Sequence, residues 1–185
     1  MDNVNIKMYD SNTVNEYKAL LNSGQIPSEF DYLYKQRLEN NKVVFILFIE
    51  KEETFLFMKK LKTYVVGYCI VEDATSKPES CKPLLDTLFE IPLEVLAEYP
   101  TVISDCMISS AYRRMGYGKY LADYVVNNIF KYKKISLHAV EDGVNFWDKI
   151  GFEYIANANS VMVIKDGERN AWNERQRYWM DWWDT

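Results

Sequence analysis

Hydrophobic and polar positions follow short periodic runs along this 185-residue chain, and the period changes from one run to the next. Runs rich in β-branched and aromatic residues predict strands at residues 4–8, 43–49, 64–71, 102–108, 135–139, 152–156 and 160–165. Runs with helical spacing predict helices from Asn12 or Thr13 to Asn22, and at residues 28–40 (with Ser28 as cap), 84–90, 93–98, 117–129, 143–150 and 168–183. Residues 50–62 are expected to turn and extend a hairpin. Because strands and helices alternate in the second half, we expect an α/β (α+β) fold with at least one parallel strand pair.

From the length and composition we expect one folded domain spanning residues 1–185. Hydrophobic residues make up 48% and charged residues 26%, an ordinary balance for a globular protein. Four of the five prolines lie between Pro78 and Pro100, which predicts a loop-rich insertion over residues 74–100.

Charge and cysteine content narrow the classes of partner. Lys+Arg 22 against Asp+Glu 27 gives a net charge of −5, which disfavours nucleic-acid and anionic-membrane binding and is compatible with a cationic substrate. With three cysteines, no metal-ligand spacing and one histidine, we expect no metal site. The chain shows no apolar run of about 20 residues and no signal-peptide pattern at its start, so we expect a cytoplasmic protein.

The segment that carries chemistry is residues 106–119, where a strand ends, a basic turn follows and two glycines open a helix. Free backbone N–H groups at a helix N-terminus form a site for a phosphate or diphosphate, and glycine lets the ligand approach the backbone. A P-loop is excluded, because it needs glycine at Arg113 and serine or threonine at Tyr120. A dinucleotide fingerprint is excluded, because it needs glycine at Leu121.

The segment Tyr112-Arg113-Arg114-Met115-Gly116-Tyr117-Gly118 resembles the [RQ]-x-x-G-x-[GA] loop of the GNAT superfamily of N-acetyltransferases. Asn145-Phe146-Trp147-Asp148-Lys149-Ile150-Gly151-Phe152 resembles that family's helix-to-strand signature, and Val66-Gly67-Tyr68 is similar to its third strand. The resemblance covers residues 43–165. It implies a GNAT-like mixed, mostly antiparallel central sheet with flanking helices.

This resemblance implies acetyl-CoA as co-substrate, with its diphosphate on the amides of residues 114–119. The pantetheine arm would pair with the β-strand backbone before this loop, and a short helix would flank the arm. The implied coenzyme-binding residues are Met107, Ile108, Arg113, Arg114, Met115, Gly116, Tyr117, Gly118, Lys119, Asn145, Phe146 and Lys149. The expected acceptor is a small-molecule or peptide amine.

Acetylation of an amine requires the removal of a proton. An amine with a pKa near 10.4 is neutral in about 1 molecule of 2,500 at pH 7, equivalent to roughly 4.6 kcal/mol. Trp147 stands where the family often has a tyrosine acid, and the position that holds a glutamate base in some members falls near Val102. The candidate catalytic residues are therefore His138 as base, the nearby carboxylate Asp105 and the phenol Tyr154. Other candidates are Glu141 and Asp142 as carboxylates, and Tyr112 and Tyr120 as acids.

Several of these residues also have a structural interpretation. The glycines could form a simple tight turn, Arg113 and Arg114 could be surface charges, His138 could be an ordinary sheet residue, and Cys106 and Trp147 could serve packing. The tryptophans of the C-terminal segment 168–185 share one helical face, which predicts packing onto the sheet, a homodimer contact or a substrate lid. The alternative functions are a catalytically impaired acyl-CoA-binding module and a protein-interaction domain.

Overall fold

The computed structural model describes residues 3–38, 42–55, 58–74, 91, 93–131, 133–155 and 161–164. The helices expected at 84–90 and 168–183 lie outside the described residues, as does most of the loop-rich insertion. None of the helices in these ranges is long and apolar enough to cross a membrane.

The strands form one seven-stranded sheet in the order β1-β2-β3-β4-β5-β7-β6. β1 pairs antiparallel with β2, β2 with β3, and β7 with both β5 and β6, whereas β4 and β5 are parallel. The expected mixed, mostly antiparallel sheet is therefore confirmed. The strand bounds are β1 Asn3–Tyr9, β2 Lys42–Phe55, β3 Met58–Asp73, β4 Thr101–Ile108, β5 Ile135–His138, β6 Glu153–Tyr154 and β7 Val161–Ile164.

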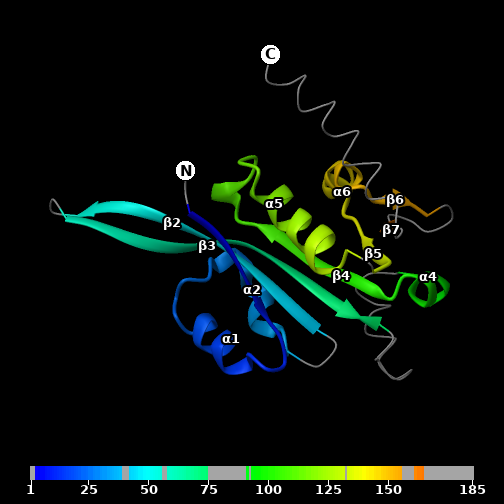
Figure 1. Cartoon of the computed structure of the whole chain (residues 1–185), viewed down its shortest axis with the longest axis horizontal. Coiled ribbons are helices and arrows are strands. Elements are labelled where there is room, and N and C mark those ends of the chain that lie inside the picture. Colours follow the sequence, from blue (N-terminus) through cyan, green and yellow to red (C-terminus); the bar gives the residue numbers. More distant parts are fainter. Residues whose placement is uncertain are drawn as a thin grey trace, which may run out of the picture. The chain divides into compact units, whose positions relative to one another are not determined.

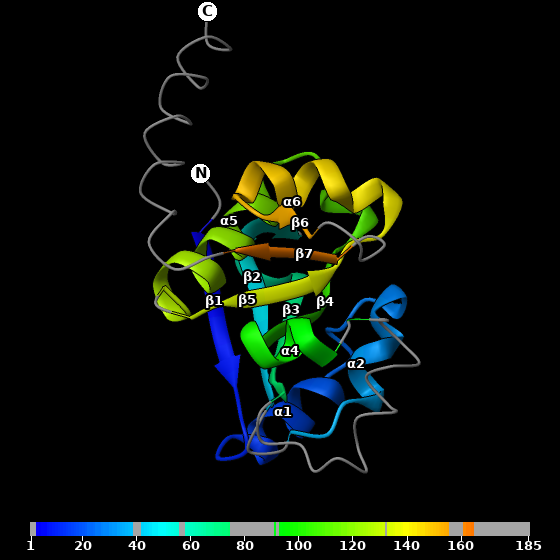
Figure 2. The same cartoon turned by 90° about the vertical axis from the view of Figure 1, so that its right-hand side faces the viewer.

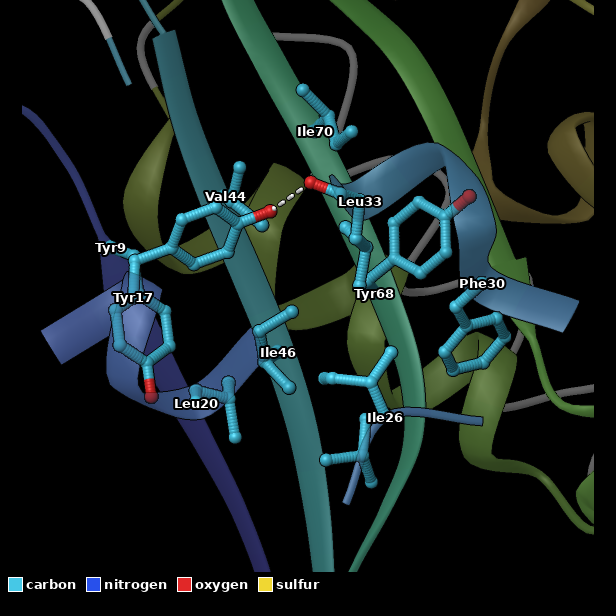
Figure 3. Packing of buried hydrophobic residues seen from close by; sticks show 11 residues of the cluster. Tyr9, Tyr17, Leu20, Ile26, Phe30, Leu33, Val44, Ile46, Tyr68 and Ile70 are labelled. Carbon is cyan, nitrogen blue, oxygen red and sulfur yellow. Dashed lines mark hydrogen bonds between the residues drawn. The ribbon is translucent and has the colours of Figure 1, made fainter. Parts of the chain in front are cut away.

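The contacts divide the described residues into two compact units, one within residues 1–72 and 104–125 and the other within residues 73–103 and 126–185. In the first unit, helices α1 (Val14–Leu21) and α2 (Asp31–Lys35) and the 3-10 turn η1 (Ser28–Phe30) pack on β2 and β3 (Figure 3). The core consists of side chains from both layers, and the Tyr17 hydroxyl donates to the Leu33 carbonyl at 2.9 Å. This unit's helices therefore hold one face of the sheet by apolar burial.

The helix predicted over residues 28–40 is much shorter than expected. It begins as the turn η1, whose N-cap is Pro27 rather than Ser28, and α2 ends at Lys35 because Gln36 is extended. Phe30, at the junction of η1 and α2, is buried in the core with residues of β2 and β3. Thr13 is the N-cap residue of α1, but its hydroxyl bonds to Asp10 instead of capping the helix.

β2 and β3 form a long hairpin that continues beyond the end of β1 (Figure 1). β1 pairs with β2 only as far as Glu50, whereas the hairpin ladder runs on to the pair Phe55 and Met58. The expectation that residues 50–62 extend a hairpin is confirmed. The register shifts between Leu47 and Phe48, which leaves Val66 unpaired in the β2–β3 ladder.

The helix predicted over residues 117–129 has two parts. Tyr117–Asp123 forms the α-helix α5, and Tyr124–Ile129 continues as the π-helix η5. A periodicity of hydrophobic residues does not distinguish these two winding states.

In the second unit, helix α4 (Leu93–Glu98) packs on strands β4 and β7 through a core of Ile91, Val95, Tyr99, Val102, Val161 and Val163. Figure 2 shows α4 and α6 (Val144–Ile150) on opposite sides of β5 and β7. α6 follows a 3-10 turn, η6 (Glu141–Gly143), and ends at Gly151, whose φ of 106° is left-handed. The amides of Gly151 and Phe152 bond back to the carbonyls of Asp148 and Trp147 at 2.9 and 3.0 Å, so this glycine terminates the helix.

Candidate functional site

The predicted phosphate loop is a corner between β4 and α5 in the first unit. The amide of Ser109 donates to the Val66 carbonyl at 2.9 Å, just beyond the end of β4, and the turn η4 (Ser110–Tyr112) follows. Two residues then adopt left-handed backbone, Arg114 with φ 62° and Gly116 with φ 82°. Gly116 is the N-cap of α5, and its carbonyl accepts the first helical bond, from the Tyr120 amide at 3.0 Å. The chain thus passes from strand β4 through the turn η4 into helix α5 within a few residues.

This corner has the geometry of an anion site. The amides of residues 117–119 lie in the first turn of α5, where the positive end of the helix dipole is located. A Cβ built on Gly116 would meet no atom within 4 Å, and residues 113–116 are exposed, so the backbone is accessible there. Met107 and Ile108 at the end of β4 are half-buried. The predicted residues 107–108 and 113–119 are therefore contiguous in the structure.

Arg113 has a structural contact in addition to its charge. Its Nε donates to the Ile108 carbonyl at 3.1 Å, which ties the loop back to the end of β4. The interpretation of Arg113 as surface charge alone is incomplete, although its side chain is exposed.

Glu29 also holds the corner in place, and no pattern in the sequence indicates this role. Its carboxylate accepts a bond from the Ser110 amide at 3.0 Å, across 81 positions of sequence. The pKa of Glu29 is lowered, first by a hydrogen bond from the Ser109 hydroxyl and also by the Ser110 amide. Glu29 lies in η1 beside the buried Phe30, so the helical layer of this unit reaches the β4–α5 corner.

Asp105, one of the predicted catalytic residues, is paired with Tyr68. The Tyr68 hydroxyl donates to Asp105 Oδ2 at 2.5 Å, and the Phe30 ring packs edge-on against Tyr68 with centroids 5.0 Å apart. Burial raises the pKa of Asp105, and the hydrogen bond from Tyr68 partly offsets that rise. Burial is also the main cause that raises the pKa of Tyr68. Asp105 is therefore a half-buried carboxylate whose ionised form is stabilised by one short hydrogen bond from the Tyr68 hydroxyl.

The other two predicted catalytic residues lie in the second unit and on different faces of its sheet. Tyr154 is paired with Met162, which is paired with Leu137, whereas His138 is paired with Val161. Paired residues share a face and consecutive residues alternate, so the side chains of His138 and Tyr154 point to opposite faces. The structure does not bring these two together.

The second motif, residues 145–152, also lies in the second unit. Asn145, Phe146 and Lys149 lie on α6, and Asn145 and Lys149 are exposed. Trp147 is buried between Phe146 and Phe152, with ring centroids 4.9 and 5.3 Å away. The packing interpretation of Trp147 is confirmed, and the Gly-Phe pair that ends the motif forms the helix terminus.

Cys106 belongs to a packed pair of thiols. A hydrogen bond with Cys106 and complete burial raise the pKa of Cys69 well above its ordinary value. Both thiols are free, and this contact supports the packing interpretation of Cys106. Within the described ranges, no three His, Cys, Asp or Glu residues are grouped so that they could hold a metal ion.

Residues 15–152 match the model of the Acetyltransferase (GNAT) family. The chain belongs to the GNAT acetyltransferase family. Its fold is similar to that of AtaTR bound with acetyl-CoA, at 12% identity, with 94% of this chain and 98% of that chain covered and a TM-score of 0.52. It is also similar to the KacTA–DNA complex, at 11% identity, 95% and 99% coverage and a TM-score of 0.51.

A third similar structure is the Bacillus subtilis N-acetyltransferase YlbP with coenzyme A, at 12% identity, 89% and 97% coverage and a TM-score of 0.42. At these identities, the two structures with TM-scores above 0.5 show a shared fold and nothing more. A search of the curated proteins found no match.

Proposed function

We propose that this GNAT protein transfers the acetyl group of acetyl-CoA to an amine by direct attack of the amine on the thioester. The observation that carries the proposal is the β4–α5 corner, with left-handed Arg114 and Gly116 leading into the first turn of α5. The diphosphate of the coenzyme would accept hydrogen bonds from the amides of residues 114–119. The backbone of Met107 and Ile108 would pair with the pantetheine arm.

The reaction forms a carbon–nitrogen bond and breaks the carbon–sulfur bond of the thioester. The amine loses one proton to a base, and the departing thiolate takes up one proton to give free coenzyme A. We favour Asp105 as the base, because burial raises the pKa of this carboxyl and so brings its basicity closer to that of an amine. A half-buried carboxylate also favours a cationic acceptor, in agreement with the acceptor class expected from the sequence.

The proposal is tested by incubating the full chain with acetyl-CoA and a panel of primary amines, while free thiol and acetylated product are measured. Turnover with at least one amine is expected, and Asp105→Asn should lower kcat about 100-fold if Asp105 is the base. His138→Gln and Tyr154→Phe are run beside it. A loss confined to His138→Gln would assign the base to His138 instead.

One observation favours a second candidate, an acyl-CoA-binding module without turnover. Trp147 is buried against Phe152 at the position where related proteins often carry a tyrosine acid, and an indole cannot supply a proton. Calorimetric binding of coenzyme A, combined with no product from any amine, would support this candidate over the enzyme.

A further inference from the structure

We infer that one face of the β2–β3 hairpin binds the 3′-phosphate of the coenzyme, an inference that rests on the proposed function. The coenzyme carries a diphosphate and a separate phosphate monoester on its ribose. The β4–α5 corner offers backbone amides for the diphosphate, whereas the hairpin offers lysine side chains beside that corner.

The register defines the residues of this face. Lys51 is paired with Lys62, and Glu53 with Lys60. Paired residues share a face, and residues two apart on one strand also share it. These four residues, Lys51, Glu53, Lys60 and Lys62, are called the hairpin face below.

The hairpin face carries an excess of positive charge. Lys51 and Lys62 stand directly opposite each other, an arrangement of like charges that is unfavourable by itself. Glu53 lies 3.6 Å from Lys62, and it is the one acidic residue among three lysines. The net positive charge of these four side chains would attract an anionic ligand to this face.

Ring contacts connect the hairpin face to the β4–α5 corner. The Lys51 ammonium lies 4.9 Å from the centroid of the Tyr112 ring. That ring lies 6.1 Å from the ring of Tyr117, the first residue of α5. Tyr112 therefore links Lys51 to the helix N-terminus that would hold the diphosphate. We expect another phosphate group of a ligand bound at that terminus to reach the hairpin face.

The distribution of charge along the sequence supports the same site. The chain has a net charge of −5, yet residues 51–62 and 109–120 together carry seven basic and two acidic side chains. A phosphate monoester carries a charge of roughly −1.5 to −2 at pH 7. It therefore attracts lysines more strongly than either of the singly charged phosphates of the diphosphate does. An acidic protein that concentrates cations at one corner favours an anionic ligand there.

The experiment compares coenzyme A with dephospho-coenzyme A, which lacks only the 3′-phosphate. The full chain and the double variant Lys51→Ala, Lys62→Ala are titrated with both by calorimetry. We expect the wild type to bind coenzyme A about fivefold more tightly than dephospho-coenzyme A. The double variant should bind the two ligands equally, with its affinity for dephospho-coenzyme A unchanged.

Lys59→Ala is the matched control. Lys59 lies on β3, as Lys62 does, but on the other face of the hairpin, where it forms an ion pair with Glu52 at 3.0 Å. It should retain the wild-type preference for coenzyme A. Thermal unfolding of all three proteins separates lost binding from lost folding.

Two results would overturn the inference while leaving the proposed function intact. The first is equal affinity of the wild type for both ligands, and the second is an equal loss of affinity for both in the double variant. If the wild type binds neither ligand, the proposed function fails together with this inference.

Discussion

Gly116 and Gly24 adopt the same left-handed backbone, with φ of 82° and 71°, and a Cβ on either would meet no atom within 4 Å. Replacement by alanine therefore adds backbone strain of about 1–2 kcal/mol in both cases without a steric clash. We predict that both variants lose similar stability and that Gly116→Ala alone loses coenzyme affinity, about tenfold. Thermal unfolding and calorimetry measure the two quantities.

Gly24 lies beyond the end of α1 and serves as the control for strain alone. An equal loss of coenzyme affinity in Gly24→Ala would show that the effect is general destabilisation, not the geometry of the β4–α5 corner.

Asp105 yields a prediction about stability that has the opposite sign from its effect on activity. Its pKa is raised by burial, so its ionised form is less favourable in the folded than in the unfolded chain. The stability that this group contributes is present below its unfolded pKa and is lost as pH rises through its folded pKa. Asp105→Asn should therefore keep or raise the Tm at pH 7 while turnover falls, and a clear drop in Tm would contradict this.

Tyr68 tunes the same carboxyl. Its hydrogen bond lowers the pKa of Asp105 against the effect of burial, so Tyr68→Phe should raise that pKa further. If Asp105 is the base, the acidic limb of kcat/KM against pH then moves to higher pH, because the carboxyl must be ionised to accept a proton. An unmoved acidic limb would assign it to another group.

At this scale the sequence identified residue types but not their partners. Asp105 was a candidate because it is a carboxylate on a strand beside the phosphate loop. Its partner Tyr68 lies 37 positions away, and Glu29 lies 81 positions from Ser110, so both contacts depend on strand pairing and helix packing that no local pattern encodes.

At the scale of elements, Gly67 allows β3 to approach the end of β4, the strand that would bind pantetheine. A Cβ on Gly67 would lie 2.9 Å from the Met107 carbonyl oxygen and would collide with the Ile108 side chain. We predict that Gly67→Ala displaces the end of β4, lowers stability by about 1–3 kcal/mol and weakens coenzyme binding. Chemical unfolding and calorimetry report the two effects.

Gly143→Ala is the matched control for Gly67→Ala. The nearest atom to its Cβ would be Val140 Cγ2 at 3.4 Å, an ordinary contact, and its φ of −89° suits any residue. It should be nearly neutral in stability. A Gly67→Ala protein as stable as Gly143→Ala would mean that β4 yields there without cost.

Elements with a strong period were predicted well, whereas elements fixed by packing were not. The strand at 102–108 and the helix after it follow the expected order, because burial and glycine placement specify them locally. The prediction of one helix over residues 28–40 was wrong, because Phe30 packs in the core beside Tyr68 and Gln36 is extended. The π-helix over Tyr124–Ile129 has no signature distinct from an α-helix in the spacing of apolar residues.

At the scale of the molecule, net charge and local charge have opposite signs. The chain is acidic overall, but the hairpin face and the β4–α5 corner are basic. At ordinary ionic strength, interactions between exposed charges more than about 8–10 Å apart are largely screened. The attraction between the coenzyme and the nearby basic residues should therefore dominate coenzyme binding. We predict that affinity for coenzyme A falls several-fold between low and moderate salt and that affinity for dephospho-coenzyme A falls less. An affinity that rises with salt would show that long-range repulsion dominates.

The family was predictable at this scale because three short motifs occur in the right order, and each has a local physical cause. Gly116 sets a left-handed N-cap, Gly151 sets a helix end, and Gly67 lets β4 approach. The acceptor amine was not predictable, because residues on separate elements select it.

On the proposed function, the β4–α5 corner holds the diphosphate of acetyl-CoA, a claim that an NMR titration of the full ¹⁵N-labelled chain tests directly. With saturating acetyl-CoA, the largest shift changes are predicted at the backbone amides of residues 114–119, with smaller changes at Met107 and Ile108. Amides at this corner that remain unchanged while the coenzyme saturates the protein would contradict the claim.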